Sequence, residues 1–291
     1  MTESLGEIIS SKNETMLKMW NVHIEAGKRP YHRHGHTRFE ITLVTDGDGK
    51  YTTSRGKFSM HKGDIVVFSS NELHNISEAG SNGLSITNMH FEPRYLLGTD
   101  SDGLSHGYMN FCFTHSPDFK NLIESNRAQP IRELFLKIKD EITEQKGEYR
   151  LAIKSYLNLL LITLLRDFRY QSAERVSNKQ LSNMLKAIEY IDGQICEKIS
   201  LDDISASAGI SPNYFCSLFR QLNGTTLWDY ISAKRIEKAI QLISERADSD
   251  TMLSIGLQCG FNNTASFNKT FKKQTGMTPT QYRNADDILL H

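Results

Sequence analysis

The chain has 291 residues, which is enough for two domains. Its 34 basic and 34 acidic residues give a formal net charge of zero, so overall charge does not point to nucleic acid or to any other highly charged partner. The four cysteines form no CxxC pair, which is typical of a reduced protein with incidental thiols. The longest apolar run, Leu157–Leu165, is too short to cross a bilayer, and the first residues lack the segments of a signal peptide. We therefore expect a soluble, cytoplasmic protein with no membrane partner.

The N-terminal third has the pattern of a small β-structure. Residues 1 to about 15 are weakly patterned and predict a frayed arm or a peripheral helix. From Met16 to about Glu92, short β-rich runs alternate with glycine and polar residues, which predicts a barrel or sandwich. Asp46-Gly47-Asp48-Gly49 predicts a hairpin turn between two of the runs. The predicted strands are Phe39–Val44, Gly49–Thr53, Lys57–Met60, Asp64–Phe68 and Leu84–Phe91.

A group of polar residues accompanies these strands. His34 and His36 are two positions apart, so on a strand they point to the same face. Glu40 follows four positions after His36, and imidazole with carboxylate suits Mn, Fe, Ni or Zn. The spacing resembles the two motifs of the cupin barrel, with Ser69 and Asn71 in place of the usual proline and glycine. The matching segments are His34-x-His36-x3-Glu40-x6-Gly47 for the first motif, and Gly63-x5-Ser69 with His74 for the second.

The cupin resemblance leaves three interpretations open. In metal-binding cupins the equivalent residues hold one ion, which would make His34, His36, Glu40 and His74 metal ligands. The favoured interpretation is a pocket for an organic effector without metal, built by the same four residues and Arg38, because a concave site with a few convergent polar groups is the usual form of a small-ligand site. The third is that the histidines only fill the barrel mouth. Four further residues could add polar groups, although each alone is expected to be a surface or rim residue: His23, His32, Tyr51 and His90.

The middle of the chain is predicted to be helical. Apolar residues recur at helical spacing in Asp118–Asn126, Ile131–Gln145 and Tyr149–Tyr170. The apolar stripe of the third helix is wider than packing on one barrel face requires, which suggests a homodimer interface as well. Gln171–Lys179 is polar and has no apolar period, so we expect a linker. The predicted organisation is an N-terminal domain over residues 1–170, a linker over 171–180 and a C-terminal domain over 181–286.

The C-terminal domain contains an internal repeat, which is stronger evidence than either copy alone. Gly260 follows Gly209 by 51 residues, and Phe271 follows Phe219 by 52. Each copy has a glycine corner followed by a short helix with an apolar stripe and a polar outer face, which predicts two helix-turn-helix units at about 201–222 and 252–274. A first helix is expected at Leu181–Glu197, and a long helix at Thr226–Glu245 joins the two units.

The second copy resembles the signature of the AraC/XylS family of bacterial transcription regulators. The resemblance covers about the last hundred residues and is highly specific. Ser205 and Gly256 stand where the family usually has alanine, and Ser266 replaces a tyrosine; we expect these departures to cost some stability and to leave the fold intact. The matching residues are Gly260, Phe261, Phe267, Phe271, Lys272, Lys273, Gly276, Thr278, Pro279, Tyr282 and Arg283.

Together these features predict a two-domain α+β protein: a cupin-like β-barrel with flanking helices, followed by an all-α domain with two helix-turn-helix motifs. Between Ile204 and Arg283 there are nine basic and five acidic residues, so this part of the chain is cationic. The family resemblance implies that both recognition helices contact DNA, with Arg220 and Lys272 at phosphates. The residues predicted to specify bases are Asn213, Cys216, Ser217, Thr264, Ala265 and Lys269, and the others expected in the interface are Tyr214, Asn263 and Ser266.

The predicted function is that of a sequence-specific transcription regulator. We expect an activator, not an enzyme, that binds promoter DNA as a homodimer, recruits RNA polymerase and responds to a small polar metabolite such as a sugar. No cofactor is expected, apart from the divalent metal that the cupin motif leaves open. The alternative is a cupin metalloenzyme that carries a DNA-binding domain. A third interpretation is a constitutive DNA-binding protein whose barrel only dimerises.

Overall fold

The computed structural model divides into two compact units, which are described separately. The first takes in most of residues 1–175 and the second most of residues 176–288. The first is rich in β-structure and the second is helical over its described residues, so the predicted two-domain α+β class is confirmed. The described residues are 2–9, 15–26, 36–53, 55–70, 72–96, 112, 115–116, 118–170, 177–223, 225–245 and 250–284.

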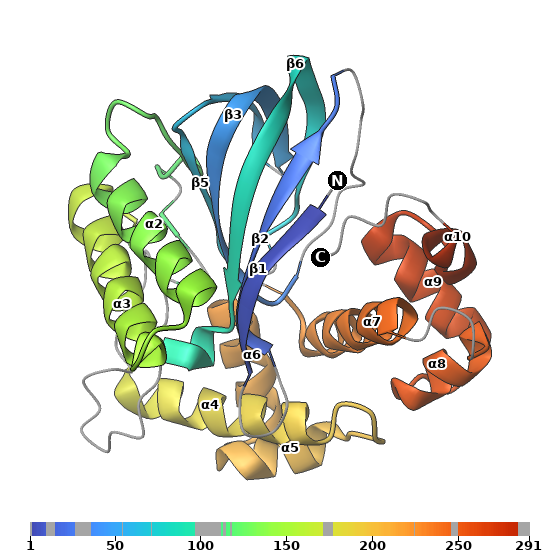
Figure 1. The fold of residues 1–291 in the computed structure, drawn as a ribbon. Coiled ribbons are helices and arrows are strands. Elements are labelled where there is room, and N and C mark those ends of the chain that lie inside the picture. Colours follow the sequence, from blue (N-terminus) through green and yellow to red (C-terminus); the bar gives the residue numbers. More distant parts are fainter. Residues whose placement is uncertain are drawn as a thin grey trace. The chain divides into compact units, whose positions relative to one another are not determined.

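The first unit is built on a seven-stranded sheet, counted over the described residues. Its order is β1-β2-β6-β3-β5-β7, with β4 paired to β3, and every pairing between described strands is antiparallel. No pairing between described residues joins β1 to β7, so the cupin-like sheet is open there (Figure 1). The strands are β1 (Thr2–Ile9), β2 (Thr15–Ile24), β3 (Phe39–Thr53), β4 (Gly56–His61), β5 (Ile65–Phe68), β6 (His74–Phe91) and β7 (Leu122–Ile123), and a short 3-10 helix, η1, spans Pro93–Leu96.

The N-terminal residues form a strand, so the prediction of a frayed arm or peripheral helix is wrong. β1 pairs with β2 along its length and Ile8 is buried, whereas most of its other side chains are at least partly exposed. An edge strand of this kind takes its stability from main-chain hydrogen bonds to its neighbour. The sequence alone therefore carries little apolar alternation to reveal it.

The predicted hairpin turn at Asp46–Gly49 is also wrong. β3 continues through this segment and pairs with β6 on both sides of it, with register shifts between Val44 and Asp46 and between Gly47 and Gly49. Gly47 has φ +73°, and a Cβ there would lie 2.1 Å from the carbonyl oxygen of Gly83. Glycine thus permits a bulge in which two backbones meet, and the two predicted strands become one long bent strand.

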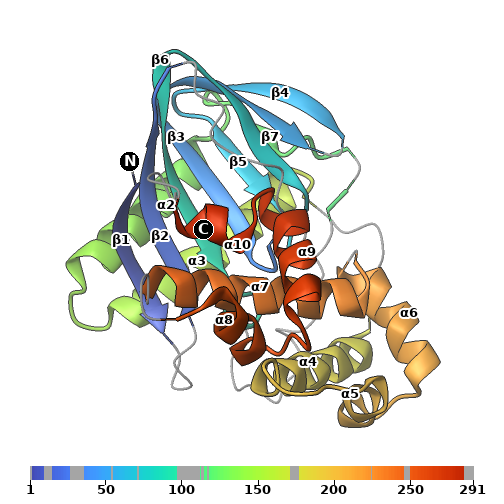
Figure 2. The same ribbon diagram turned by 90° about the vertical axis from the view of Figure 1, so that its right-hand side faces the viewer.

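The sheet has two differently covered faces. Helices α2 (Gln129–Glu144) and α3 (Tyr149–Asp167) lie over the outer face (Figures 1 and 2). The predicted helix at Asp118–Asn126 is absent: Leu122 and Ile123 pair with β5, and Asn121 has φ 62°. The inner face carries an apolar cluster of Trp20, Val22, Ile24, Val44, Tyr51, Met60, Val66, Phe68, Ile76, Ala79, Leu84 and Ile86.

The second unit consists of short helices joined to one long helix. Figure 2 shows α7 running between the group α4–α6 and the group α8–α10. Ser177 and Gln180 form a capping box, so α4 begins inside the predicted linker. The helices are α4 (Asn178–Gly193), α5 (Leu201–Ala208), α6 (Pro212–Asn223), α7 (Leu227–Glu245), α8 (Met252–Gln258), α9 (Thr264–Thr275) and α10 (Pro279–Arg283).

Aromatic packing holds the second helix-turn-helix together. Phe267 and Phe271 of α9 are fully buried, with Phe261 and Tyr282 beside them, and all pack on α7. Gly256 of α8 faces this cluster, and a Cβ there would lie 2.9 Å from Cγ of Phe267. The glycine that departs from the family pattern therefore makes room for a phenylalanine ring. No helix formed by the described residues is both long enough and apolar enough to cross a membrane.

Candidate functional site

Helix α6 separates its apolar and polar residues sharply. Phe215, Leu218 and Phe219 are buried, and Phe219 packs edge-on against Tyr230 of α7 at 5.3 Å. The predicted contact residues of this helix are all exposed, which leaves them available to a partner. They are Asn213, Tyr214, Cys216, Ser217 and Arg220.

A groove adjoins the exposed side of α6. It has a volume of about 660 Å³ and runs from α6 to the first turn of α7, where Trp228 is 50% exposed. Sequence reasoning did not single out Trp228, although an aromatic residue off the apolar stripe of a helix was the available signal. The lining residues are Cys216, Ser217, Arg220, Gln221, Thr226, Leu227 and Trp228.

Helix α9 repeats the same division. Asn263 caps it, since its Oδ1 accepts a hydrogen bond of 2.8 Å from the backbone N–H of Ser266. The side chain of Asn263 is therefore engaged in holding the helix end. Thr264 is half-buried, and four predicted contact residues are exposed: Ala265, Ser266, Lys269 and Lys272.

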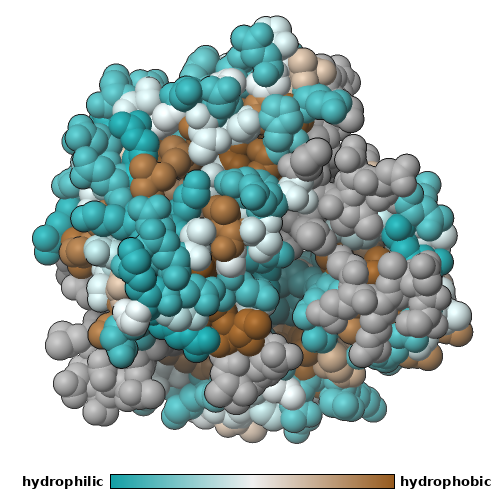
Figure 3. Space-filling model, viewed as in Figure 1, coloured by the Kyte–Doolittle hydropathy of each residue, from teal (hydrophilic) through white to brown (hydrophobic). Residues whose placement is uncertain are grey.

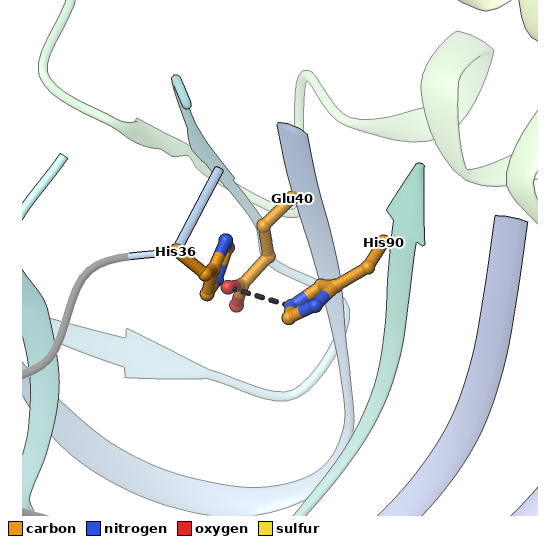
Figure 4. Close-up of side chains that lie close together, drawn as sticks. All are labelled: His36, Glu40 and His90. Atoms are coloured by element: carbon orange, nitrogen blue, oxygen red, sulfur yellow. Dashed lines mark hydrogen bonds and ion pairs between the residues drawn. The ribbon is translucent and has the colours of Figure 1, made fainter. Parts of the chain in front are cut away.

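A polar cluster lies on the inner face of the first unit. Nε2 of His90 and Nε2 of His74 lie 2.9 Å and 3.1 Å from the same Oε2 atom of Glu40. His36 approaches the same carboxylate (Figure 4), so that His36, Glu40 and His90 each bring one ligand atom to within 4.8 Å of the other two. These side chains are buried, with Glu40 and His90 both 3% exposed.

Strand register creates the cluster. Glu40 of β3 pairs with His90 of β6 on one side and with Phe68 of β5 on the other, and Thr42 pairs with Asn88. Residues two apart on a strand share a face, so Thr42 lies beside Glu40 and donates a hydrogen bond of 2.8 Å to its Oε1. The polar cluster thus continues the apolar inner face.

The aromatic and backbone neighbours fix the histidine rings. Phe68 stacks on His74 with ring centroids 3.9 Å apart, and Trp20 meets His90 edge-on at 4.6 Å. His74 donates from Nδ1 to the backbone carbonyl of Glu72 at 2.8 Å, which leaves Nε2 facing Glu40. Burial by itself lowers the pKa of His74, but the charge and hydrogen bond of Glu40 outweigh it and the net shift is upward.

The predicted effector and metal residues are only partly brought together. His36, Glu40 and His74 lie in the cluster, whereas His34 falls outside the described residues. The guanidinium of Arg38 lies 3.5 Å from the carboxylate of Glu92, with its Nε facing Oε1. His90, expected at the surface or rim, is instead buried at the centre, and strand pairing opposite Glu40 was the signal that could have placed it there.

A second buried network lies at the other side of β5. Glu72 accepts from Asn121 Nδ2 at 2.9 Å and from the backbone N–H of Ser69 at 3.1 Å, and its Oε2 lies 3.1 Å from His115 Nε2. Burial raises the pKa of Glu72, but these hydrogen bonds and the charge of His115 outweigh it and lower the pKa overall. Asn121 also donates to the backbone carbonyl of Val67 at 2.9 Å, which connects the network to β5.

These two units define a class of protein in which a ligand-binding domain precedes a DNA-binding domain. A model of the AraC-like ligand binding domain matches residues 22–161, and a helix-turn-helix domain model matches residues 204–285. The chain therefore belongs to the AraC family of DNA-binding transcriptional regulators.

Individual relatives agree with this assignment over most of the chain. The melibiose operon regulatory protein of Escherichia coli strain K12 is 26% identical over 266 residues, which cover 86% of this chain and 82% of that protein. The HTH-type transcriptional activator RhaR of Shigella dysenteriae is 25% identical over 253 residues, 86% of each protein. ToxT from Vibrio cholerae has a similar fold, with a TM-score of 0.65 at 11% identity over 92% of this chain and 98% of that one.

Proposed function

We propose that this protein binds promoter DNA at specific sequences and activates transcription by helping to recruit RNA polymerase. Activation would occur when a small polar metabolite occupies the N-terminal unit, and sugars are the first class of metabolite to test. The observation that carries the proposal is the matched design of α6 and α9. Each helix buries a phenylalanine pair and exposes a continuous polar flank. Two such helices joined by a long one suit entry into successive major-groove segments.

The exposed residues divide by chemistry into two roles. Arg220 and Lys272 are cations suited to phosphates, which fix position. Trp228, beside the groove at α6, would pack its ring against the sugar-phosphate backbone. The bases would be specified by Asn213, Cys216, Ser217, Thr264, Ala265 and Lys269, while Tyr214, Asn263 and Ser266 support the helix ends beside them.

The exposed face of α3 supports a homodimer. Leu151, Leu159 and Ile162 are 64%, 50% and 39% exposed, and they lie on the side of the helix opposite the buried Leu157 and Leu160. A helix that is apolar on both sides buries only one of them within its own unit. A second copy of this chain would cover the other. On the face of the molecule in Figure 3, the apolar side chains occur as separate patches among hydrophilic ones.

Sugar as the effector class is supported by the melibiose operon regulatory protein, whose name links it to a sugar operon. A crystal structure of ToxT contains an unsaturated fatty acid, so fatty acids belong in the same screen. A true effector raises the apparent stability of the protein that binds it.

The test has two arms. Genome-wide mapping of bound sites, followed by gel shifts on the recovered fragments, should give one sequence motif with two half-sites; retention of all fragments equally would contradict sequence-specific binding. A thermal-shift screen with sugars, fatty acids and related metabolites should then yield a compound that changes transcription from a mapped promoter in vitro.

A further inference from the structure

The buried cluster around Glu40 has the composition of a metal site. Two imidazoles and one carboxylate, from His36, His90 and Glu40, place ligand atoms within 4.8 Å of one another. On a tetrahedral ion with bonds of about 2.0–2.2 Å, neighbouring ligand atoms lie about 3.3 Å apart. Small side-chain rotations would therefore close the three groups around one ion (Figure 4).

We propose that His36, Glu40 and His90 bind one divalent transition-metal ion, such as Zn²⁺ or Co²⁺, at the carboxylate of Glu40. The ligand set differs from the one predicted from sequence, because His90 replaces His34 and His74. Any role of the bound ion in sensing an effector rests on the proposed function as a regulator, whereas binding of the ion itself does not.

The surroundings of the three ligands are those of a preorganised site. Thr42 Oγ1 lies 2.8 Å from Glu40 Oε1, and His74 Nε2 lies 3.1 Å from Glu40 Oε2, so both carboxylate oxygens are held. The edge-on contact with Trp20 orients His90. Neighbours that orient the ligands in this way are a regular part of metal sites, and His74 is assigned this positioning role.

Charge and size favour an ion over a neutral organic molecule at this point. His36, Glu40 and His90 are 8%, 3% and 3% exposed, and their polar atoms already approach one another closely. A sugar would have to separate them, whereas an ion would fit between them and compensate the buried carboxylate. Mg²⁺ and Ca²⁺ prefer sets made of oxygen atoms, so two imidazoles indicate a transition metal.

Three protein ligands leave at least one coordination position open. A hydroxyl or carboxylate oxygen of a small polar molecule could bind there, as substrates do at open metal sites. The ion would then hold a polar effector at the inner face of the sheet, which is otherwise mostly apolar. The geometry thereby specifies the effector class further: a small molecule that offers an oxygen donor to a metal.

The experiment measures metal binding by the full-length protein. Protein stripped with a chelator is dialysed against Zn²⁺ or Co²⁺, its metal content is measured by mass spectrometry, and bound Co²⁺ is followed by its visible absorption. We expect one ion per chain in the wild type. His90→Gln and Glu40→Gln, which keep side-chain volume, should each weaken binding by at least about tenfold. His61→Gln is the matched control, since that side chain is 69% exposed and far from Glu40 in the register of β3 and β4.

Two outcomes overturn the proposal. One is wild-type protein that keeps its circular-dichroism spectrum but retains neither ion after dialysis, whatever the variants do. The other is unchanged affinity in folded His90→Gln and Glu40→Gln. Gel shifts on the same samples test the proposed function separately. Sequence-specific DNA binding without metal binding refutes only the metal site, whereas metal binding without sequence-specific DNA binding refutes only the proposed function as a regulator.

Discussion

The ammonium group of Lys273 lies 3.1 Å from Oδ1 of Asp229, and this ion pair joins the end of α9 to the first turn of α7. The hydroxyl of Thr226 donates to the other oxygen, Oδ2, at 2.7 Å. The hydrogen bond from Thr226 and then that from Lys273 lower the pKa of Asp229. Lys273 therefore has an acidic partner within its own unit, whereas the neighbouring Lys272 side chain is exposed on α9.

This difference predicts unequal effects of two adjacent lysines on DNA binding. Lys272→Ala should weaken binding to all sequences and reduce the slope of log K against log salt by about 0.9, the value for one lost phosphate contact. Lys273→Ala should change that slope less, because its charge is already partly compensated by Asp229. Fluorescence anisotropy over a salt series measures both slopes. Equal slopes for the two variants would remove the distinction drawn from the ion pair.

Asn213 is predicted to read a base. It is exposed at the start of α6, and asparagine pairs well with the major-groove edge of adenine. Asn213→Ala should cost about 1–3 kcal/mol on the preferred site and relax the preference at a single base position. Selection of binding sites from a random library reports the preference. The control is Asn158→Ala, which changes an exposed asparagine of α3. An unchanged base preference in Asn213→Ala, or a relaxed base preference in Asn158→Ala, would refute this placement of α6.

Gly256→Ala is predicted to destabilise the protein, although alanine normally favours a helix over glycine by about 1 kcal/mol. The new Cβ would lie 2.9 Å from Cγ and Cδ1 of Phe267, a fully buried ring with Phe261 and Phe271 against it. Overpacking of this kind typically costs about 1–3 kcal/mol, which exceeds the propensity gain. Urea unfolding measures the sign. A higher unfolding midpoint for Gly256→Ala would mean that the ring moves aside freely.

Glu72 gives a prediction for pH. Its pKa in the folded protein is lowered from 4.5, so its contribution to stability is present above that pH and is lost as pH falls through the folded pKa. Glu72→Gln should cost about 2 kcal/mol at neutral pH, because the amide has no charge and keeps only one of the two acceptor oxygens that His115 and Asn121 use. The difference from wild type should shrink below about pH 4.5.

A matched control for this variant is Glu78→Gln. Glu78 pairs with Lys50 at 2.9 Å, but both side chains are about half exposed, at 54% and 49%. Such a pair contributes at most about 0.5 kcal/mol, so the variant should unfold almost like wild type at every pH. If the two substitutions have the same effect, the buried network around Glu72 does not carry the stability assigned to it.

The proposed dimer depends on the exposed stripe of α3. Leu159→Glu should shift the protein to monomers, since a charge would be buried at the centre of the interface. Multi-angle light scattering at micromolar concentration measures the mass. Leu257→Glu on α8 is the control, because Leu257 is 52% exposed but belongs to the second unit. A wild-type protein that is already monomeric would refute the dimer.

Sequence patterns predicted the second unit well because its signals are local. Asn263 and Thr278 cap helices with their own side chains, and glycine at 276 ends α9 in a left-handed conformation, whereas the cap at Ser177 fell within the predicted linker. The repeated phenylalanines at helical spacing located the buried side of α9, and the exposed flank followed from it. Each of these features acts within a few residues of the chain, where sequence reasoning is strongest.

The first unit was harder because its decisive contacts join distant residues. β1 depends on pairing with β2, and His90 reaches Glu40 only through the register of β6 against β3. Asn121 takes a left-handed φ and gives both amide hydrogens to distant partners, so the residues around it pair as a strand rather than coil as a helix. Spacing along the chain does not encode such pairings, whereas His34, His36 and Glu40 stand close together in the sequence and matched the cupin motif directly.

The close approach of Gly47 to Gly83 has a consequence for variation in this protein. Both residues have positive φ, and at both a side chain would run into neighbouring backbone, at 2.1 Å and 2.9 Å. The bend in the two longest strands described is therefore set by the absence of side chains at two positions that lie outside the proposed sites. In a saturation library screened for reporter activity, these two glycines should tolerate as few replacements as the proposed metal ligands. A map of intolerant positions would therefore need structural context before it could be interpreted as a map of the effector pocket.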